Sequence, residues 1–224
     1  MLFNLLRGGD IQTFLISLLL TLPIVFLSLS VHESAHGYVA YKLGDPTARN
    51  FGRLTLNPFK HLDPIGFLCM VLFGFGWAKP VPIDTRYFKK PRRDMALTGV
   101  AGPISNLLLA ILFALFLKVE YVALDFISLN GDVAYQFFYW MQQFFLIAIR
   151  LNVTLAVFNL IPIPPLDGSR LLFAVLPPEQ YFKFMRYERY ISIALLLALA
   201  FGFLDTPINF VSILFLRLID LIVF

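Results

Sequence analysis

The feature that most constrains this chain is an uncharged apolar run that ends directly in ionisable residues. Residues 11–31, "IQTFLISLLLTLPIVFLSLSV", contain no charged side chain, and about 20 such residues cross the hydrocarbon core of a bilayer as a helix. The sequence "HESAH", residues 32–36, follows at once. Ionisable groups at membrane depth are costly and normally mark function. The run therefore predicts a transmembrane helix that bends at Pro23, continues past His36 and carries a functional site near one end.

The composition extends this prediction to the whole chain. Of 224 residues, 59% are hydrophobic and 14% are charged, whereas about 25% are charged in a soluble domain. We therefore expect residues 1–224 to form a single membrane-embedded domain. The lone cysteine, Cys69, excludes an internal disulfide. The first apolar run is long and lacks a small-residue cleavage site, so a cleaved signal peptide is not expected.

Other apolar runs predict the remaining spans. Residues 95–117 form the second candidate, and residues 133–161 form the third. Any break in the third span is expected near Arg150 or Asn152. Residues 190–204 and 208–224 are weaker candidates that would form a closing helical hairpin. The predicted fold class is an all-α polytopic membrane protein, a bundle of about four to six transmembrane helices.

The segment between the first two spans, residues 63–88, has a different pattern. Its apolar part is short for a span and is interrupted by glycine and proline, which favours a re-entrant or interfacial segment. Residues 73–83 alternate in polarity and are expected to form extended strands that receive a substrate peptide; a simple aromatic anchor at the interface is the alternative. Non-helical backbone is tolerated at membrane depth only against protein or water, so this loop should lie against the site.

The distribution of charge predicts the orientation in the membrane. Residues 38–94 hold ten of the eighteen lysines and arginines, and residues 170–189 add four more, so both segments should face the cytoplasm. Residues 118–132 are acidic and are expected outside. These assignments describe a multi-pass protein of the cell membrane with its site toward the cytoplasm. The basic run at 86–94 fits contact with anionic lipid headgroups, and we expect no nucleic acid partner.

The "HESAH" motif has the HExxH pattern of zinc hydrolases. On a helix, His32 and His36 share one face and can bind one zinc ion, while Glu33 can act as general base. An interfacial polar cluster and a hydrogen-bonded pair of histidines are the alternatives. A third ligand is usual, and Asp167 in "NLIPIPPLDG", residues 159–168, follows prolines that must interrupt the helix and can aim its carboxylate inward. An ordinary Asp-Gly turn is the alternative there. His61 is expected to be a solvated loop histidine and not a ligand.

Three motifs in this order resemble the site-2 protease family of intramembrane zinc metalloproteases, in its compact prokaryotic form without a PDZ-sized insertion. They are "HESAH", "GPISN" at 102–106 and "NLIPIPPLDG". The resemblance implies that His32, His36 and Asp167 bind Zn²⁺ and that Glu33 is the catalytic glutamate.

The same resemblance extends to two asparagines. It implies that Asn159 positions the substrate or stabilises the oxyanion, and that Asn106 contributes to substrate binding. For Asn106, the alternative is a hydrogen bond between helices, because Gly99 and Gly102 allow helices to pack closely.

The implied activity is hydrolysis of peptide bonds in transmembrane or membrane-adjacent segments. The partner would then be a membrane protein substrate with a transmembrane helix, within the lipid bilayer; the oligomeric state is left open. A metal transporter or an inactive metal-binding scaffold is the alternative function. A transporter should place polar groups along both halves of a pathway, whereas here they gather at one end, and only the protease needs Glu33.

Overall fold

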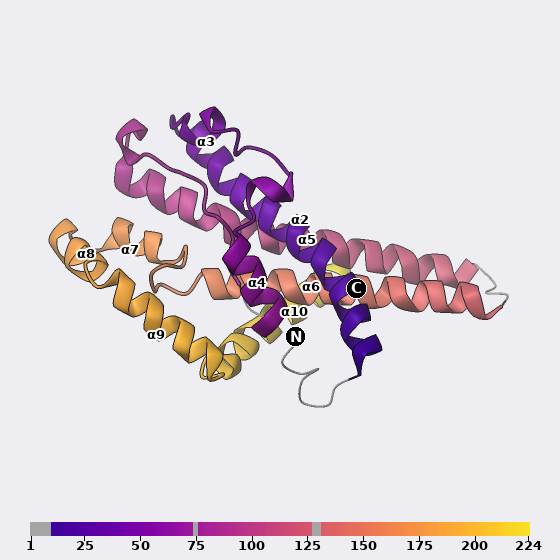
Figure 1. Ribbon diagram of the computed structural model, residues 1–224. Coiled ribbons are helices and arrows are strands. Elements are labelled where there is room, and N and C mark those ends of the chain that lie inside the picture. Colours follow the sequence, from indigo (N-terminus) through magenta and orange to yellow (C-terminus); the bar gives the residue numbers. More distant parts are fainter. Residues whose placement is uncertain (1–9, 74–75, 127–130) are drawn as a thin grey trace.

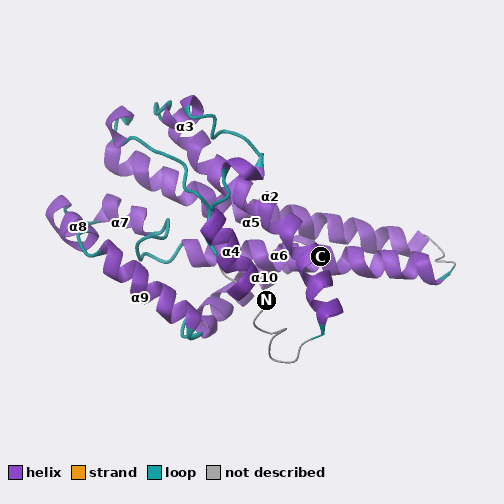
Figure 2. Cartoon of the chain, in the orientation of Figure 1, coloured by secondary structure: helices purple, strands orange, loops and turns teal. Residues whose placement is uncertain are grey.

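The computed structural model describes residues 10–73, 76–126 and 131–224 (Figure 1). Regular structure in these ranges is helical, and they contain no strand (Figure 2). The helices, in chain order, are α2 (Ile11–Lys42), α3 (Thr47–Asn50), α4 (Pro64–Phe73), α5 (Pro91–Phe126), α6 (Asp132–Asn159), α7 (Ser169–Val175), α8 (Pro178–Met185), α9 (Glu188–Ala200) and α10 (Asp205–Val223), with 3₁₀ turns at Pro58–Lys60 and Thr85–Tyr87.

Four of the described helices, α2, α5, α6 and α10, are long and apolar enough to cross a membrane. The 13 residues of α9 extend only about 20 Å at 1.5 Å per residue, less than a hydrocarbon core of about 30 Å. The all-α polytopic fold is therefore confirmed. Of the two weaker candidate spans near the C-terminus, only the second, in α10, is long enough to cross.

The core of the bundle lies where α5 packs along α6 and α2, with α10 against both α5 and α6. Small and aromatic side chains alternate on the buried face of α5, where Ala110, Phe113, Ala114 and Leu117 are almost fully buried. Small residues let helices approach closely in a membrane, where packing rather than the hydrophobic effect holds them together. The long pair α5 and α6 thus forms the frame against which α2 packs.

Helix α6 is continuous, so the break considered near Arg150 or Asn152 does not occur. Asn152 is fully buried within the helix, and its amide donates to the Ala148 carbonyl, 2.9 Å away. Because that polar group is satisfied inside the bundle, it does not interrupt the helix. The helix ends at Asn159, and turns occupy the proline-rich residues up to the start of α7, as the sequence predicts.

The segment between α2 and α5 contains one short apolar helix, α4, followed by an irregular stretch that leads back to α5. The ten residues of α4 extend about 15 Å, too short for a span. The expected strands over 73–83 are not formed in the described residues, where one isolated antiparallel bridge joins Leu62 to Ala78. Residues 74–75 of that prediction lie outside the described ranges. A re-entrant position of the loop stays a prediction.

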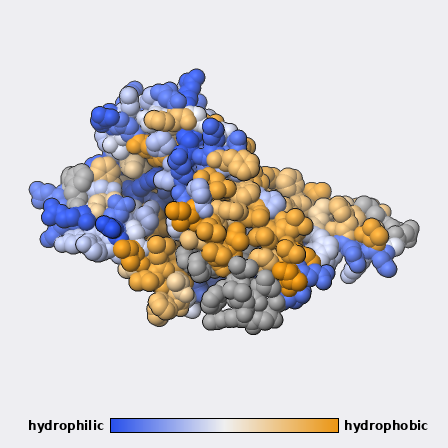
Figure 3. All heavy atoms as spheres, viewed as in Figure 1, coloured by the Kyte–Doolittle hydropathy of each residue, from blue (hydrophilic) through white to orange (hydrophobic). Residues whose placement is uncertain are grey.

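Hydrophilic and hydrophobic residues separate along the molecule. In Figure 3, hydrophobic spheres cover the middle of the visible face, and hydrophilic spheres gather around α3 at the top and around α7 and α8 at the left. The C-terminal end of α2, which carries the HExxH motif, leads into this polar end (Figure 1). The motif therefore lies where an apolar bundle meets a polar surface.

Candidate metal centre

The two histidines of the motif lie one turn apart on the same face of α2, because that helix continues unbroken to Lys42. Both side chains are buried, and their Nε2 atoms are 3.1 Å apart. The rings meet edge to face, with an interplanar angle of 84°. Both Nε2 atoms therefore point to a common position.

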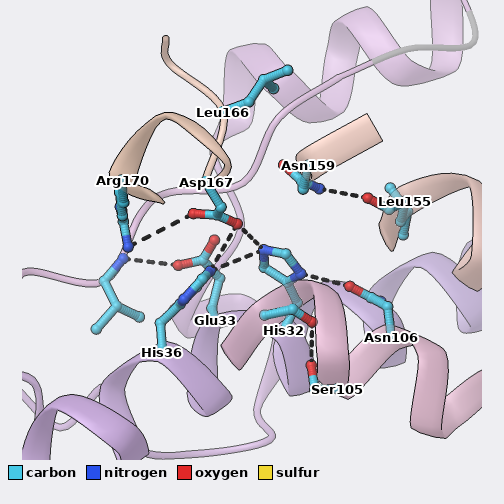
Figure 4. A network of polar contacts seen from close by, with 12 residues as sticks. His32, Glu33, His36, Ser105, Asn106, Leu155, Asn159, Leu166, Asp167 and Arg170 are labelled. Atoms are coloured by element: carbon cyan, nitrogen blue, oxygen red, sulfur yellow. Dashed lines mark hydrogen bonds and ion pairs between the residues drawn. The ribbon is translucent and has the colours of Figure 1, made fainter. Parts of the chain in front are cut away.

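Asp167 joins them from the turns that follow α6. Its Oδ2 lies 2.9 Å from His32 Nε2 and 3.0 Å from His36 Nε2 (Figure 4). Among the described residues, these three side chains form the one group of at least three histidine, cysteine or acidic residues able to hold a metal ion together. Because prolines end the helix before Asp167, its carboxylate can turn inward and does not follow the helix axis.

The outer nitrogen of each imidazole faces an oxygen atom. His32 Nδ1 lies 2.5 Å from Asn106 Oδ1, and His36 Nδ1 lies 2.6 Å from the carbonyl oxygen of Thr98. Each oxygen accepts a hydrogen bond from Nδ1–H, and a neutral imidazole with its proton on Nδ1 has its lone pair on Nε2. Two lone pairs and a carboxylate oxygen then converge on one position, an arrangement that a cation neutralises.

This donor set fits zinc. Catalytic zinc sites use three protein ligands of imidazole and carboxylate type and keep a fourth position open. Zinc–ligand bonds of about 2.0–2.1 Å in a tetrahedron place ligand atoms about 3.3 Å apart. The observed separations of 2.9, 3.0 and 3.1 Å are close to that value.

The protonation state of Asp167 follows from the groups around its carboxylate. Its burial raises the pKa of the carboxyl, but the hydrogen bonds and charge interactions that the two imidazoles make in their protonated form outweigh burial, so the pKa lies well below its ordinary value. Asp167 is therefore an anion at neutral pH. Its other oxygen, Oδ1, lies 3.7 Å from Arg170 Nη1, on the first turn of α7.

Helix α5 closes the back of the centre through a glycine. A Cβ atom at Gly102 would lie 2.5 Å from His32 Cε1 and 2.6 Å from His32 Nε2, and closer still to His36 Nε2. Such contacts are too short for any side chain. Only glycine at this position lets α5 pack against both imidazoles.

Glu33 is buried beside the three groups, and Figure 4 shows its carboxylate next to Asp167 and His36. Its Oε2 accepts a hydrogen bond from the backbone N–H of Val81, 2.8 Å away. Val81 belongs to the irregular return between α4 and α5. A carboxylate in this position is available to exchange protons with a group bound at the centre.

The two predicted asparagines have different surroundings. Asn106 is fully buried on α5, with Oδ1 at His32 and its amide donating to Asn152 Oδ1, 2.9 Å away. The amide of Asn159 donates back to the Leu155 carbonyl, 2.9 Å away, one turn earlier on α6. The hydrogen bond between helices that was the alternative for Asn106 is therefore present. The substrate roles of both asparagines stay predictions.

Sequence reasoning missed several residues and misplaced one. His61 is almost fully buried, and its Nε2 lies 2.8 Å from the Thr55 carbonyl, so the prediction of a solvated histidine is wrong. Asn152 supports Asn106, whereas from the sequence it was considered only as one of two places where the span could break. Its signal was a polar residue within the apolar third span. Val81 and Thr98 contribute through their backbones, for which a sequence carries no side-chain signal.

A buried centre of two histidines and one aspartate, with a buried glutamate beside it and a bundle of long apolar helices around it, defines a membrane-embedded metallohydrolase. Residues 20–201 match the model of peptidase family M50, and the chain belongs to that family. This confirms the site-2 protease resemblance.

The names of similar proteins agree with this family. The chain is 45% identical over 167 residues to "Putative zinc metalloprotease YwhC" of Bacillus subtilis, covering 74% of this chain and 73% of that protein. It is 34% identical over 159 residues to "Putative zinc metalloprotease Rip2" of Mycolicibacterium smegmatis, covering 68% of this chain and 56% of that protein. It is 29% identical over 187 residues to "Zinc metalloprotease MJ0392" of Methanocaldococcus jannaschii, covering 83% of this chain and 43% of that protein.

No solved structure matches the chain significantly. Family and relatives together confirm the predictions of an intramembrane zinc metalloprotease, of zinc metalloendopeptidase activity and of Zn²⁺ as its cofactor.

Proposed function

We propose that this protein hydrolyses peptide bonds in transmembrane or membrane-adjacent segments of membrane proteins, at the centre formed by His32, His36, Asp167 and Glu33. The observation that carries the proposal is the convergence of three buried ligand atoms 2.9 to 3.1 Å apart, next to the buried carboxylate of Glu33. A zinc ion held there supplies Lewis acidity to a water molecule and to the scissile carbonyl.

Glu33 is the proposed general base. Its carboxylate takes the proton of the attacking water and then gives it to the leaving amine. Since Oε2 already accepts the Val81 N–H, the other oxygen, Oε1, is the atom that handles the proton. The burial of Glu33 supports this role, because a carboxylate enclosed by protein transfers protons only within the site.

The asparagines have distinct proposed roles. Asn106 holds the tautomer and orientation of His32, as the outer partners of metal-binding histidines commonly do. Any contact of Asn106 with substrate would require it to leave both of its present partners. Asn159 stands at the open end of α6, and its amide would stabilise the oxyanion after releasing the Leu155 carbonyl.

We also propose that the centre opens toward the cytoplasmic side of the cell membrane. The basic residues of 38–94 and 170–189 flank the polar end of the bundle, and such residues face the cytoplasm. Water for hydrolysis would enter from that side. The substrate is a membrane protein with a transmembrane helix, which must unwind locally because a helix keeps its carbonyls in internal hydrogen bonds.

The test is the substitution Glu33→Gln, which keeps the size of the side chain and removes its basicity. Purified E33Q should retain one zinc per chain and should cleave a model single-span substrate about a hundred- to ten-thousandfold more slowly, since general acid–base catalysis contributes about 10²–10⁴-fold. Glu179→Gln, at an exposed position of α8, is the matched control and should cleave normally. Cleavage by E33Q at the normal rate would contradict the proposal and would favour a metal-binding transporter or scaffold.

A further inference from the structure

The sequence "KPVPID", residues 79–84, has no regular secondary structure and contacts Glu33 at the centre. Within Pro80–Val81–Pro82, only Val81 has a backbone N–H, because proline has none. That single donor is used: it points at Glu33 Oε2, 2.8 Å away. Val81 is 5% exposed and Glu33 is 9% exposed, so the hydrogen bond is shielded from water.

The 79–84 segment is fixed on both sides of Val81. Before it, the Lys79 N–H donates to the His61 carbonyl at 2.7 Å, and the Lys79 carbonyl accepts from Arg53 Nη2 at 2.6 Å. After it, the Asp84 N–H donates to Asp45 Oδ2 at 2.8 Å. These partners come from the segment between α2 and α4, and His61, Arg53 and Asp45 are all buried. The position of Val81 is therefore set by structure outside the catalytic motif.

A glycine one turn beyond Glu33 lets the segment approach α2. A Cβ atom at Gly37 would lie 2.7 Å from Leu54 Cδ2, 3.0 Å from Ala48 Cβ and 3.2 Å from Val81 Cγ1. A larger residue there would push these side chains outward. The glycine after "HESAH" thus allows Val81 to contact the helix that carries Glu33.

We propose that the Val81 N–H is a positioning group for the general base, an inference that rests on the proposed function of Glu33. The terminal torsion of a glutamate is broad and roughly two-fold, so a free carboxylate would present either oxygen in many orientations. The charge-assisted hydrogen bond from Val81 fixes Oε2. Oε1, which accepts no hydrogen bond from the described residues, is held in one orientation toward the centre before substrate arrives.

The test removes this one N–H with Val81→Pro. We expect V81P to keep one zinc per chain and to bind a model single-span substrate with a KM within about twofold of the unchanged protein, while kcat falls by about ten- to a hundredfold, because small misplacements of a catalytic group cost about 10²-fold. Val81→Ala keeps the N–H, so the kcat of V81A should be at least tenfold higher than the kcat of V81P. Ile83→Pro is the matched control for the proline ring, since the Ile83 N–H makes no hydrogen bond within the described residues.

Three outcomes would overturn the inference. V81P and V81A could lower kcat equally, V81P could raise KM with kcat kept, or V81P could lose its zinc. A raised KM would assign the segment to peptide docking.

If V81P does not accumulate, exchanging the Val81 amide for an ester removes the N–H and keeps the side chain, and the same criteria apply. Activity of E33Q would refute the proposed function itself, whereas an inactive E33Q with V81P equal to V81A would refute only the role of Val81.

Discussion

At the scale of single residues, each group that faces the metal position has a partner on its far side. His32 is backed by Asn106, His36 by the Thr98 carbonyl and Asp167 by Arg170. Two of these partners belong to α5, which contributes no ligand itself. Outer partners fix the tautomer and the direction of metal ligands, and their loss commonly costs 10- to 100-fold in affinity or activity.

Asn106 is the partner whose removal is easiest to measure. Asn106→Leu keeps a similar volume but leaves His32 Nδ1 without its acceptor and Asn152 without a donor. We expect the affinity for zinc to fall about 10- to 100-fold, measured by competition with a chelator of known affinity. Ser105→Ala, at the neighbouring position, should bind zinc as the unchanged protein does. Equal affinities for N106L and S105A would show that Asn106 does not support His32.

The sequence predicted side chains at the centre better than it predicted backbone groups. The spacing of His32 and His36 determines a shared helix face, so their meeting needs no information beyond local geometry. The proline run before Asp167 likewise has a local effect. The contact of Val81 with Glu33 joins residues 48 apart through a backbone N–H, and no residue type signals it. His61 was misread because its burial depends on a loop that folds back over it.

At the scale of elements, the loop between α2 and α5 is held together by a carboxylate. Asp45 is fully buried just after the end of α2 and accepts hydrogen bonds from the backbone N–H groups of Thr47, at 2.9 Å, and Asp84, at 2.8 Å. It also accepts from the Thr47 hydroxyl. One side chain therefore joins the start of α3 to the end of the 79–84 segment.

We expect Asp45→Ala to lower the thermal stability of the purified protein. Two buried N–H donors would lose a charged acceptor, and hydrogen bonds to charged groups contribute about 1.5–3 kcal/mol each. At about 2–4 °C per kcal/mol for a chain of this size, the melting temperature in detergent should fall by about 5 °C or more. Asp125→Ala, at an exposed position near the end of α5, provides the comparison. A melting temperature for D45A within a degree of D125A would contradict this account.

Hydropathy located the helices well but not their internal details. The long runs on α2, α5 and α6 predicted spans because every backbone group inside lipid must be satisfied within a helix. Hydropathy cannot separate lipid-facing from core residues. Asn152 was therefore considered as the site of a possible helix break, whereas it is a core residue bonded to Asn106. For residues 73–83, alternation predicted strands. In the described part of this range, however, the backbone groups of Lys79 and Val81 bond to residues outside any strand, and no neighbouring strand is present in the described ranges.

At the scale of the whole molecule, bound zinc would connect α2 to the turns after α6. A ligand that binds only the folded state stabilises it, by about 4.1 kcal/mol at a concentration 1,000 times its Kd. We expect chelation to lower the melting temperature of the protein by about 8–16 °C, and re-addition of zinc to restore it. The variant His36→Ala should melt at the same temperature with and without zinc. An unchanged melting temperature after full removal of zinc would rule out this stabilising connection.

The orientation of the whole bundle gives a second prediction at this scale. Lys90, before α5, and Asp132, at the start of α6, are exposed and lie on opposite sides of the second predicted span. Cysteines introduced singly at these positions in a Cys69→Ala background should react differently in intact cells. A membrane-impermeant maleimide should label D132C and leave K90C unlabelled until the cells are opened. The reverse pattern would place the centre on the outer side.

The separation of the ligands along the chain also affects synthesis. His32 and His36 emerge from the ribosome early, whereas Asp167 follows them by more than 130 residues and comes after the end of α6. A nascent chain with only its first two hydrophobic helices inserted therefore holds two of the three proposed ligands. With the proposed ligand set, such a chain would be unable to complete the centre or to cleave neighbouring proteins at the translocation machinery. Proteolytic competence would then arise only after the third long helix has entered the bilayer.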